Sequence, residues 1–445
     1  MTQTLYNAYL KLLRECIMLK SISTDPEFTA EMQKTADWFH HQFINNGFTS
    51  ELVEGFGNPI VLASFIVNKQ APTILVYGHY DVQPAAKDDG WSIDPFHLTE
   101  HNGRLVGRGI VDNKGQVLIH TATIFHLIQT KSLTSNVIFM IEGNEETGSP
   151  LLESFVRAHA SKLTSDYILI SDGETIADYP VIEAGFRGVV NATITLRTLK
   201  TDVHSGLMGG VAPSAAHEGA RLIATFHDAQ NRVCVLGFYD HVVEPTVPQL
   251  KNNSAIPFSL DDYEKITGSK HVFSESKYDI YTQTGLRPAL EVTGLFAGYT
   301  GVGYRNSIPG TCLIKLNARL VDGQKPEDLQ KALERHVKKH LPSYVSYTIE
   351  FSESAPAVTI DTFDPIFGTI STILSTVSGK KVLYKYVGGS IPIVATFKEV
   401  LRKPVLSVPL ANDDCNMHGA DENFQTDYIK RGLDFSKHLF STQIL

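Results

Sequence analysis

The stretch Glu142–Ser149 (EGNEETGS) decides how this chain is interpreted. It follows the apolar run Val137–Ile141, which predicts a buried strand. Glu145 and Glu146 therefore stand side by side just beyond a buried strand, where two carboxylates cost several kcal/mol unless a cation or strong donors compensate them. An isolated pair of this kind is most often a solvated acidic turn. The rest of the chain argues against that, because three other apolar runs also end in His or Asp.

Outward from this stretch, strand-like and helix-like segments alternate. Strands are predicted at 60–67, 73–77, 137–141 and 167–170, and helical segments within 1–50 and at 117–128 and 151–163. Strands that alternate with helices form a largely parallel sheet that helices cover on both faces. The first part of the chain is therefore predicted to be an α/β domain.

The pattern changes near Gly188. Two helices, at 213–227 and 326–341, stand among about four strands and predict an inserted α+β sandwich of the ferredoxin-like type. The chain returns to the first domain near Pro356, which gives the predicted division 1–187, 188–356 and 357–445. The segment 244–284 is less regular, and the sequence assigns it no role.

Composition excludes several classes of protein. The 445 residues are 42% hydrophobic and 20% charged, as in ordinary globular proteins. A net charge of −9 without a basic run disfavours nucleic-acid binding, and no apolar run approaches the roughly 20 residues of a membrane span. Charges interrupt residues 1–20, which predicts an amphipathic helix rather than a signal peptide. Four cysteines without a CxxC pair predict reduced thiols in a cytoplasmic protein.

Five acids and histidines at or soon after the ends of apolar runs form a candidate metal-ligand set. They are His79, Asp112, Glu146, Asp172 and His418. Ligands of open α/β sheets gather outside the carboxyl ends of the strands. Imidazole and carboxylate ligands without thiolates suit catalytic zinc, with manganese or cobalt as alternatives. The three acids and a bridging hydroxide balance the charge of two divalent ions, so a site for two ions is predicted.

Each of these residues has an ordinary structural explanation when taken alone. A single His after a strand, such as His79, is more often a hydrogen-bonded structural residue. Asp112 and Asp172 stand in turn-like segments where an Asp commonly caps a helix or a turn, and His418 could be a surface residue. These explanations do not predict acids and histidines at successive strand ends, so the joint pattern favours the metal site.

The same segments resemble the motifs of the dinuclear-zinc metallopeptidases, the family of carnosinases, cytosolic non-specific dipeptidases, aminoacylase-1, carboxypeptidase G and the succinyl-diaminopimelate desuccinylases. The matching segments are 79–84 (HYDVQP), 107–115 (GRGIVDNKG), 142–149 (EGNEETGS), 171–173 (SDG) and 417–419 (MHG). They occur in order along almost the whole chain. The resemblance implies a catalytic domain formed by 1–187 and 357–445, a lid and dimerisation domain at 188–356, and a homodimer.

The resemblance also distributes the ligands. It implies that Asp112 bridges both metal ions, that His79 and Asp172 complete one site, and that Glu146 and His418 complete the other. A cis peptide bond is expected after Asp112, because the family often has one there.

Three further residues receive catalytic roles by resemblance. Asp81 would orient His79, as carboxylates commonly do for metal-binding imidazoles. Glu145 would be the general base, which takes the proton of the attacking water, activated by the metals, and delivers it to the departing amine. His204 lies in a segment that resembles the lid motif (DVHSG), whose His reaches across a dimer interface and stabilises the oxyanion.

Substrate contacts follow in the same way. Arg319 resembles the Arg that clamps the substrate carboxylate, a task that suits a bidentate guanidinium. Gly388, Gly389 and Ser390 resemble a turn that binds the same carboxylate through backbone N–H groups. Asn306 is a further candidate contact from the lid.

An Asp at position 172 is typical of family members that cleave true peptides, and it favours a dipeptidase that acts on dipeptides or short peptides. The alternative on the same scaffold is an amidohydrolase acting on N-acyl or N-carbamoyl amino acids. A non-catalytic metal or peptide binder is disfavoured because it would not need Glu145. Nucleotide-binding and serine-hydrolase motifs are absent from the sequence.

Overall fold

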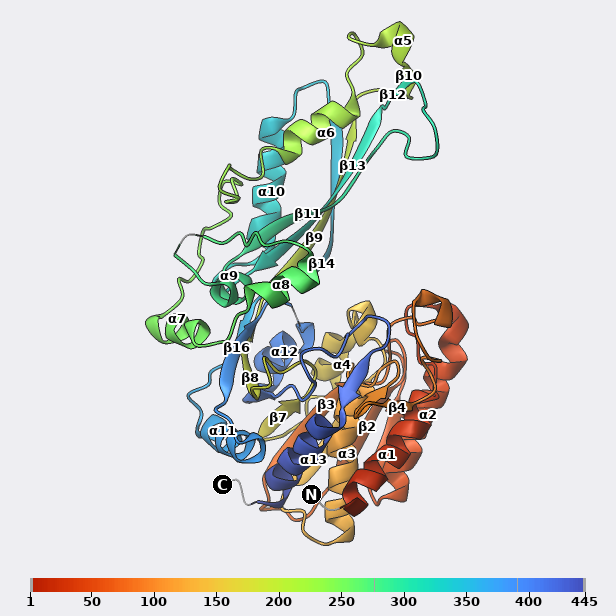
Figure 1. Ribbon diagram of the computed structural model, residues 1–445, viewed down its shortest axis with the longest axis vertical. Coiled ribbons are helices and arrows are strands. Elements are labelled where there is room, and N and C mark those ends of the chain that lie inside the picture. Colours follow the sequence, from red (N-terminus) through yellow and green to blue (C-terminus); the bar gives the residue numbers. More distant parts are fainter. Residues whose placement is uncertain (1–2, 276, 390, 443–445) are drawn as a thin grey trace. The chain divides into compact units, whose positions relative to one another are not determined.

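The computed structural model describes residues 3–275, 277–389 and 391–442 (Figure 1). The chain divides into two compact units. Their bounds, given next, differ by a few residues from the expected 187/188 and 356/357, and a second short segment also belongs to unit 2. Unit 1 comprises Met1–Ala184, Ile360–Lys385 and Ile393–Leu445, and unit 2 comprises Gly185–Thr359 and Tyr386–Pro392.

Unit 1 is an α/β unit. Its helices are α1 (Gln3–Ile17), α2 (Thr29–Asn45), α3 (Lys114–Gln129), α4 (Leu152–His159), α11 (Pro365–Ser378), α12 (Pro392–Thr396) and α13 (Thr426–Ser441). Its main strands are β1 (Thr49–Val53), β2 (Ile60–Phe65), β3 (Thr73–His79), β6 (Asn136–Glu142), β7 (Tyr167–Ile170), β17 (Val405–Ser407), β8 (Val181–Phe186) and β16 (Leu383–Val387), of which β8 and β16 end in unit 2. A small sheet combines β18 (Asn423–Gln425), β5 (Arg104–Val106) and β4 (Thr99–His101).

The main sheet is parallel at its centre. Its strand order is β1-β2-β6-β3-β7-β17-β8, continued by β15 (Val358–Thr359), and β16 pairs with β8. The four central strands β6, β3, β7 and β17 run parallel, and the pairs β1–β2, β2–β6 and β17–β8 are antiparallel. Parallel pairing places the ends of β3 and β7 side by side, because Tyr77 lies opposite Ile170. The predicted fold class is confirmed.

Helices cover both faces of this sheet because its strands are apolar on both sides, as the fully buried β6 and β7 illustrate. Successive side chains of a strand point to opposite faces. On β3, Gly78 approaches Val117 of α3, whereas the neighbouring Tyr77 packs against Phe397 with ring centroids 5.5 Å apart. On the α3 side, α1 and α13 lie beside α3 (Figure 1).

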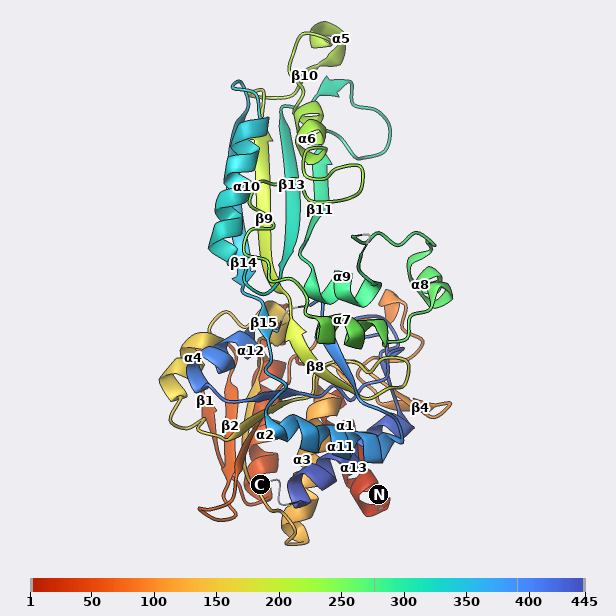
Figure 2. The same ribbon diagram turned by 90° about the vertical axis from the view of Figure 1, so that its left-hand side faces the viewer.

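Unit 2 is an α+β sandwich. Its antiparallel sheet has the order β11 (Ala289–Ala297), β13 (Thr311–Leu320), β9 (Gly188–Arg197), β14 (Ser346–Ala355). The helices α6 (Ala215–Ile223) and α10 (Pro326–His340) pack on the sheet (Figure 2). Alternate residues from Val190 to Leu196 are buried in one core with Leu333 of α10. The element order β9-α6-β11-β13-α10-β14 is the ferredoxin-like pattern that was predicted.

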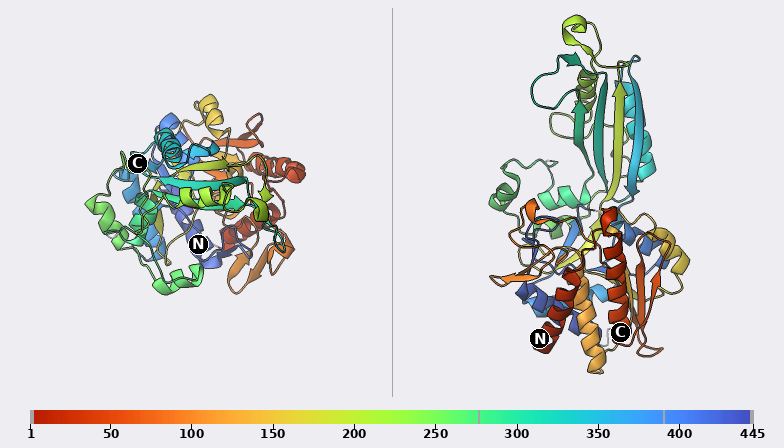
Figure 3. Two further views of the ribbon diagram at one scale, coloured as in Figure 1. Left: turned by 90° about the horizontal axis from the view of Figure 1, so that it is seen from above. Right: turned by 90° about the vertical axis from the view of Figure 1, so that its right-hand side faces the viewer.

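The segment 244–284 contains three short helices, α7 (Val247–Ser254), α8 (Leu260–Thr267) and α9 (Ile280–Leu286). Figure 2 labels the three helices near one another, and Figure 3 shows the same green segment in two further views. An ion-pair network fixes the two ends of this segment, because Arg287 pairs with Glu244 at 3.0 Å and with Glu275 at 2.8 Å. The Arg287 side chain is almost fully buried, so these pairs are structural.

Two further findings bear on composition. None of the described helices is long and apolar enough to cross a membrane. All four cysteines are free in the part of the chain that the structure describes.

Glu183 explains why β8 was not predicted: its carboxylate is buried in the middle of the strand and accepts a hydrogen bond from Ser407 Oγ at 2.7 Å. Burial raises the pKa of Glu183 to about 7. In the unfolded chain this carboxyl ionises near pH 4.5, so folding stability falls as the pH rises from there through 7.

Glu183→Gln is therefore expected to stabilise the protein at pH 8, by up to about 3 kcal/mol, and to change little at pH 5. Thermal unfolding of both proteins in chelator at the two pH values tests this. An equal shift at both pH values would contradict the assignment.

Candidate metal centre

The first ligand group forms where the central strands end. His79 is the last residue of β3, and Asp172 follows β7 by two residues. His79 Nε2 lies 3.5 Å from Asp172 Oδ2 and 3.0 Å from Asp112 Oδ1. The three side chains are buried or nearly so. Neighbouring parallel strands thus bring together residues that are far apart in the sequence.

The loop before α3 carries Asp112 into this group. The Asp112–Asn113 peptide bond is cis, as the resemblance implied. Gly115 allows the loop to close, because a Cβ at this position would stand 1.8 Å from the Ile110 carbonyl oxygen. No residue other than glycine fits such an approach. Asn113 donates to the carbonyl oxygen of Ser171 at 2.6 Å and so ties the loop to the segment that carries Asp172.

Asp112 also belongs to a second group. His418 Nε2 lies 2.7 Å from Asp112 Oδ2 and 3.5 Å from Glu146 Oε2. The two oxygens of Asp112 therefore face two different imidazoles. In each group one ligand atom per residue can be chosen so that all lie within 4.8 Å of one another. The structure brings all five sequence-predicted ligands together in unit 1.

The electrostatics of the cluster show that it lacks positive charge. Burial would lower the pKa of His79, but Asp172, Asp112 and Asp81 together raise it well above its usual range. The hydrogen bond to Asp112 raises the pKa of His418. Burial, reinforced by the charge of Asp112, raises the pKa of Glu146 to about 7. These shifts reflect an excess of negative charge in the cluster, which favours the binding of cations.

The donor set fits divalent metal ions. His79 Nε2 is buried and has no hydrogen-bond partner among the described residues, yet it faces carboxylate oxygens of Asp112 and Asp172. A cation bound by imidazole nitrogen and carboxylate oxygen would satisfy all of these atoms. No thiolate is present in either group, which agrees with a catalytic rather than a structural type of zinc site.

Asp81 contacts the candidate centre without belonging to either ligand group. Its Oδ1 lies 3.3 Å from His79 Nδ1, where the resemblance placed it. It also accepts the backbone N–H groups of Glu145 and Glu146 at 3.2 and 3.1 Å and the hydroxyl of Ser23 at 2.6 Å. One carboxylate thus fixes both an imidazole and the turn that carries the Glu pair, and the second of these tasks was not predicted.

Glu145 begins the 3₁₀ turn Glu145–Thr147, directly after β6 and Gly143–Asn144. Burial raises the pKa of Glu145 well above its usual range, while the charge of His79 opposes this shift. The charges of Asp172 and Asp112 raise it further, so Glu145 interacts electrostatically with both candidate ligands. Gln83, which the sequence gave no reason to select, donates to Glu146 Oε2 at 2.6 Å and holds that ligand.

The remaining predicted residues belong to unit 2. His204 ends the short strand β10 (Val203–His204), and its Nδ1 accepts the N–H of Gly206 at 3.0 Å. This strand pairs with β12 (Ser307–Ile308), and Ser205 donates to the Asn306 carbonyl oxygen, so the His204 and Asn306 segments are neighbours. Their roles stay predictions.

Arg319 and Gly388 gather around a residue that the sequence did not reveal. Arg187 donates to the Gly388 carbonyl oxygen at 3.0 Å, and burial together with the nearby charge of Arg319 lowers the pKa of Arg187 to about 10. Gly389 follows directly, and Ser390 lies outside the described residues. The concentration of positive charge suits an anionic group, as the prediction for Arg319 requires.

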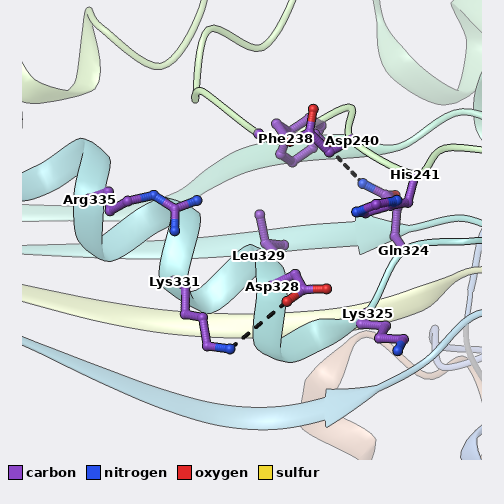
Figure 4. A pocket seen from close by; sticks show the side chains of 10 residues that line it. Phe238, Asp240, His241, Gln324, Lys325, Asp328, Leu329, Lys331 and Arg335 are labelled. Carbon is purple, nitrogen blue, oxygen red and sulfur yellow. Dashed lines mark hydrogen bonds and ion pairs between the residues drawn. The ribbon is translucent and has the colours of Figure 1, made fainter.

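Unit 2 also has a hollow of about 190 Å³ that contains none of the predicted residues (Figure 4). Both signs of charge line it, because Asp240 and Asp328 stand among Lys325, Lys331 and Arg335. The lining therefore selects no class of ligand.

Comparison with known proteins places this chain among metallopeptidases. Residues 75–442 match the family described as Peptidase family M20/M25/M40. The chain is 31% identical to the beta-Ala-His dipeptidase of Rattus norvegicus over 82% of this chain and 75% of that protein. It is 28% identical to the Cys-Gly metallodipeptidase of Candida albicans over 95% of this chain and 92% of that protein. A metallo-carboxypeptidase of Sulfolobus solfataricus has a similar structure, with a TM-score of 0.89, 25% identity and full coverage of both chains.

Proposed function

Because the chain belongs to Peptidase family M20/M25/M40, we propose that it hydrolyses the peptide bond of dipeptides or short peptides at a centre of two divalent metal ions. The family that the motifs resembled is confirmed, and with it the prediction of a peptide-hydrolysing enzyme. The observation that carries the proposal is Asp112, which is shared by two ligand groups beside the partly buried pair Glu145 and Glu146.

His79, Asp112 and Asp172 would hold one ion, and Asp112, Glu146 and His418 the other. Zinc suits these ligands best, and manganese and cobalt are the alternatives. Such ions, when bound, polarise the scissile carbonyl group and acidify a water molecule.

Glu145 is the general base of this proposal. Its carboxylate accepts a proton from the attacking water as the carbon–oxygen bond forms, and it returns that proton to the amine nitrogen as the carbon–nitrogen bond breaks. The carboxylate is thereby regenerated, and the products are a carboxylic acid and an amine. The backbone contacts to Asp81 keep the turn that carries Glu145 in place during both transfers.

Unit 2 would supply the substrate contacts. Arg319 and the turn at Gly388 and Gly389 suit the free carboxylate of the substrate, with Arg187 beside them. His204 would act on the oxyanion from a partner subunit, which requires the homodimer that the resemblance implied. The four free cysteines support a cytoplasmic protein.

Dipeptides are favoured over longer substrates because the two curated relatives described above are named as dipeptidases, one for beta-Ala-His and one for Cys-Gly. The similarity to a carboxypeptidase over the full length gives specific support to a second activity, removal of the C-terminal residue from short peptides.

A panel of substrates tests the proposal. Metal content per chain is measured together with the hydrolysis of dipeptides, tripeptides, N-blocked peptides and N-acetyl or N-carbamoyl amino acids. About two ions per chain with preferred cleavage of dipeptides would support the proposal. Preferred cleavage of N-blocked peptides would indicate a carboxypeptidase, and preferred cleavage of N-acyl amino acids would replace the dipeptidase by an amidohydrolase.

His204→Ala is expected to retain both metal ions and to lose roughly 10²- to 10³-fold in kcat, the usual effect of removing one oxyanion donor. His204 is exposed, and among the described residues the hydrogen bond of its side chain goes to the neighbouring Gly206, so stability should change little. His217→Ala, at another exposed position of unit 2, is the matched control. Unchanged turnover of the His204 variant would exclude this role.

A further inference from the structure

Glu422 is a buried carboxylate that belongs to neither ligand group. Its Oε2 accepts the N–H of Gly109 at 2.9 Å, and its Oε1 accepts the N–H groups of Val111 and Asp112 at 2.8 and 3.2 Å. Burial raises its pKa. One side chain from the C-terminal part of unit 1 thus shapes the loop that carries the shared ligand Asp112.

Arg108, from the 107–112 loop, in turn contacts the segment that carries Glu422. Its Nη1 donates to Glu422 Oε2 at 2.8 Å, and its Nη2 faces the carbonyl oxygens of His418 and Gly419 at 3.3 and 3.1 Å. The guanidinium also lies over the Trp91 ring, 5.1 Å from its centroid. The 107–112 loop and the 418–422 loop are therefore tied to each other by side chains of both.

The 418–422 loop needs such support. His418 has φ +61°, and Asp421 has φ +53°. Left-handed conformations of residues other than glycine cost on the order of 1 kcal/mol each, and they persist where the surroundings impose them. A bond from Arg108 to the His418 carbonyl oxygen acts on the residue whose imidazole must reach Asp112.

Stability alone is a poor explanation for this pair. A buried ion pair is often no better than well-packed apolar residues of the same volume. The hydrogen bonds of Arg108 and Glu422 are instead directed to the backbone of two ligand segments, 310 residues apart in sequence at Asp112 and Glu422. Hydrogen bonds of this kind are expected of residues whose role is to position the metal ligands.

We propose that Arg108 and Glu422 are positioning residues that hold Asp112 and His418 in place for the ion of the Asp112–Glu146–His418 group. This inference rests on the proposed metal centre. The other group shares Asp112, but its remaining members His79 and Asp172 stand at or just after strand ends that Arg108 and Glu422 do not hold, so it is expected to be affected less.

Glu422→Gln tests it, because the amide keeps the shape but its nitrogen cannot accept the bonds that an oxygen accepts now. Titration of the metal-free protein with Zn²⁺ or Mn²⁺ in a calorimeter is expected to show one ion bound as in the wild type. The second should bind roughly 10- to 100-fold more weakly, as is usual when the partners that orient metal ligands are lost. Arg108→Lys keeps the charge but cannot reach both loops, so it should show the same selective loss.

Asp414→Asn is the matched control. Asp414 forms an ion pair with Arg104 at 2.6 Å, and this pair likewise joins strand β5 to the C-terminal part of unit 1. The other described partners of its side chain are Asn412 and Gln425, not Asp112 or His418. It should bind both ions normally. Equal weakening of both ions, normal binding of both by the Glu422 and Arg108 variants, or fewer than two ions in the wild type would each overturn the proposal. Because hydrolysis is not the readout, a wild type that binds two ions and cleaves no peptide would refute the proposed function alone.

Discussion

Glu145→Gln is expected to lower kcat by on the order of 10²- to 10⁴-fold while both metal ions stay bound, because general-base catalysis typically contributes that much. Glutamine keeps the size of the side chain, and the backbone N–H groups of Glu145 and Glu146 that Asp81 holds are unchanged. The ligands therefore stay in place, and only the group that accepts the proton is lost. Steady-state kinetics on a dipeptide and metal analysis of the same sample measure both effects.

The pH profile gives an independent check. Burial raises the pKa of Glu145, and only its carboxylate can accept a proton, so its protonation should reduce activity on the acid side of the profile. The residual activity of the glutamine variant should lack this acid limb. Glu51→Gln, which removes an exposed ion pair with Lys162, is the control and should behave as the wild type. A Glu145 variant with normal kcat and an unchanged acid limb would disprove the role.

Asp112→Ala is expected to abolish binding of both ions and to reduce activity by at least about 10³-fold, because loss of an ion removes several kcal/mol of transition-state stabilisation. Its two oxygens face His79 and His418 respectively, so one substitution damages both groups. His418→Ala, in contrast, should weaken only the group it shares with Glu146.

Thermal unfolding with and without chelator reports the loss of metal binding without the use of any substrate. Ligands that bind only the folded state stabilise it, by about 4 kcal/mol at a thousand times Kd. Chelator should therefore lower Tm of the wild type and leave Tm of the Asp112 variant unchanged. Asp166→Asn, which removes a carboxylate that accepts the Thr73 N–H at the start of β3, is a control at the far end of the same strands. A chelator-sensitive Asp112 variant with two ions would contradict the shared-ligand geometry.

The sequence predicted those parts of the fold in which apolar residues follow one another in continuous runs. The runs at 73–77, 137–141 and 167–170 became the central strands because both faces of a parallel sheet are apolar. Acids and histidines at or soon after the ends of apolar runs could then be selected as candidate ligands, because packing alone does not explain them. The strands β8 and β16 did not stand out, because Glu183 and Lys385 interrupt their apolar pattern.

What the sequence did not reveal is which polar residues outside the candidate ligand set contact one another. Arg108 and Glu422 are far apart along the chain, and neither has a local pattern that points to the other. Arg187 is likewise recognisable only once burial and the neighbouring Arg319 are known. The helices in 244–284 are short, and their caps at Thr246 and Asp279 gave too weak a signal within an irregular segment.

The discontinuity of unit 1 has a consequence for how the protein is made. His79, Asp112, Glu146 and Asp172 precede the whole of unit 2 in the chain, and His418 and Glu422 follow it. Domains fold broadly from the N-terminal side during synthesis. On the ribosome, the strand ends of β3 and β7 can therefore form early, whereas the proposed ion of the Asp112–Glu146–His418 group would lack a complete set of ligands until the 418–422 loop has emerged. A nascent chain would thus carry an incomplete centre until the 418–422 loop has been synthesised, and the proposed hydrolytic activity could begin only after that point.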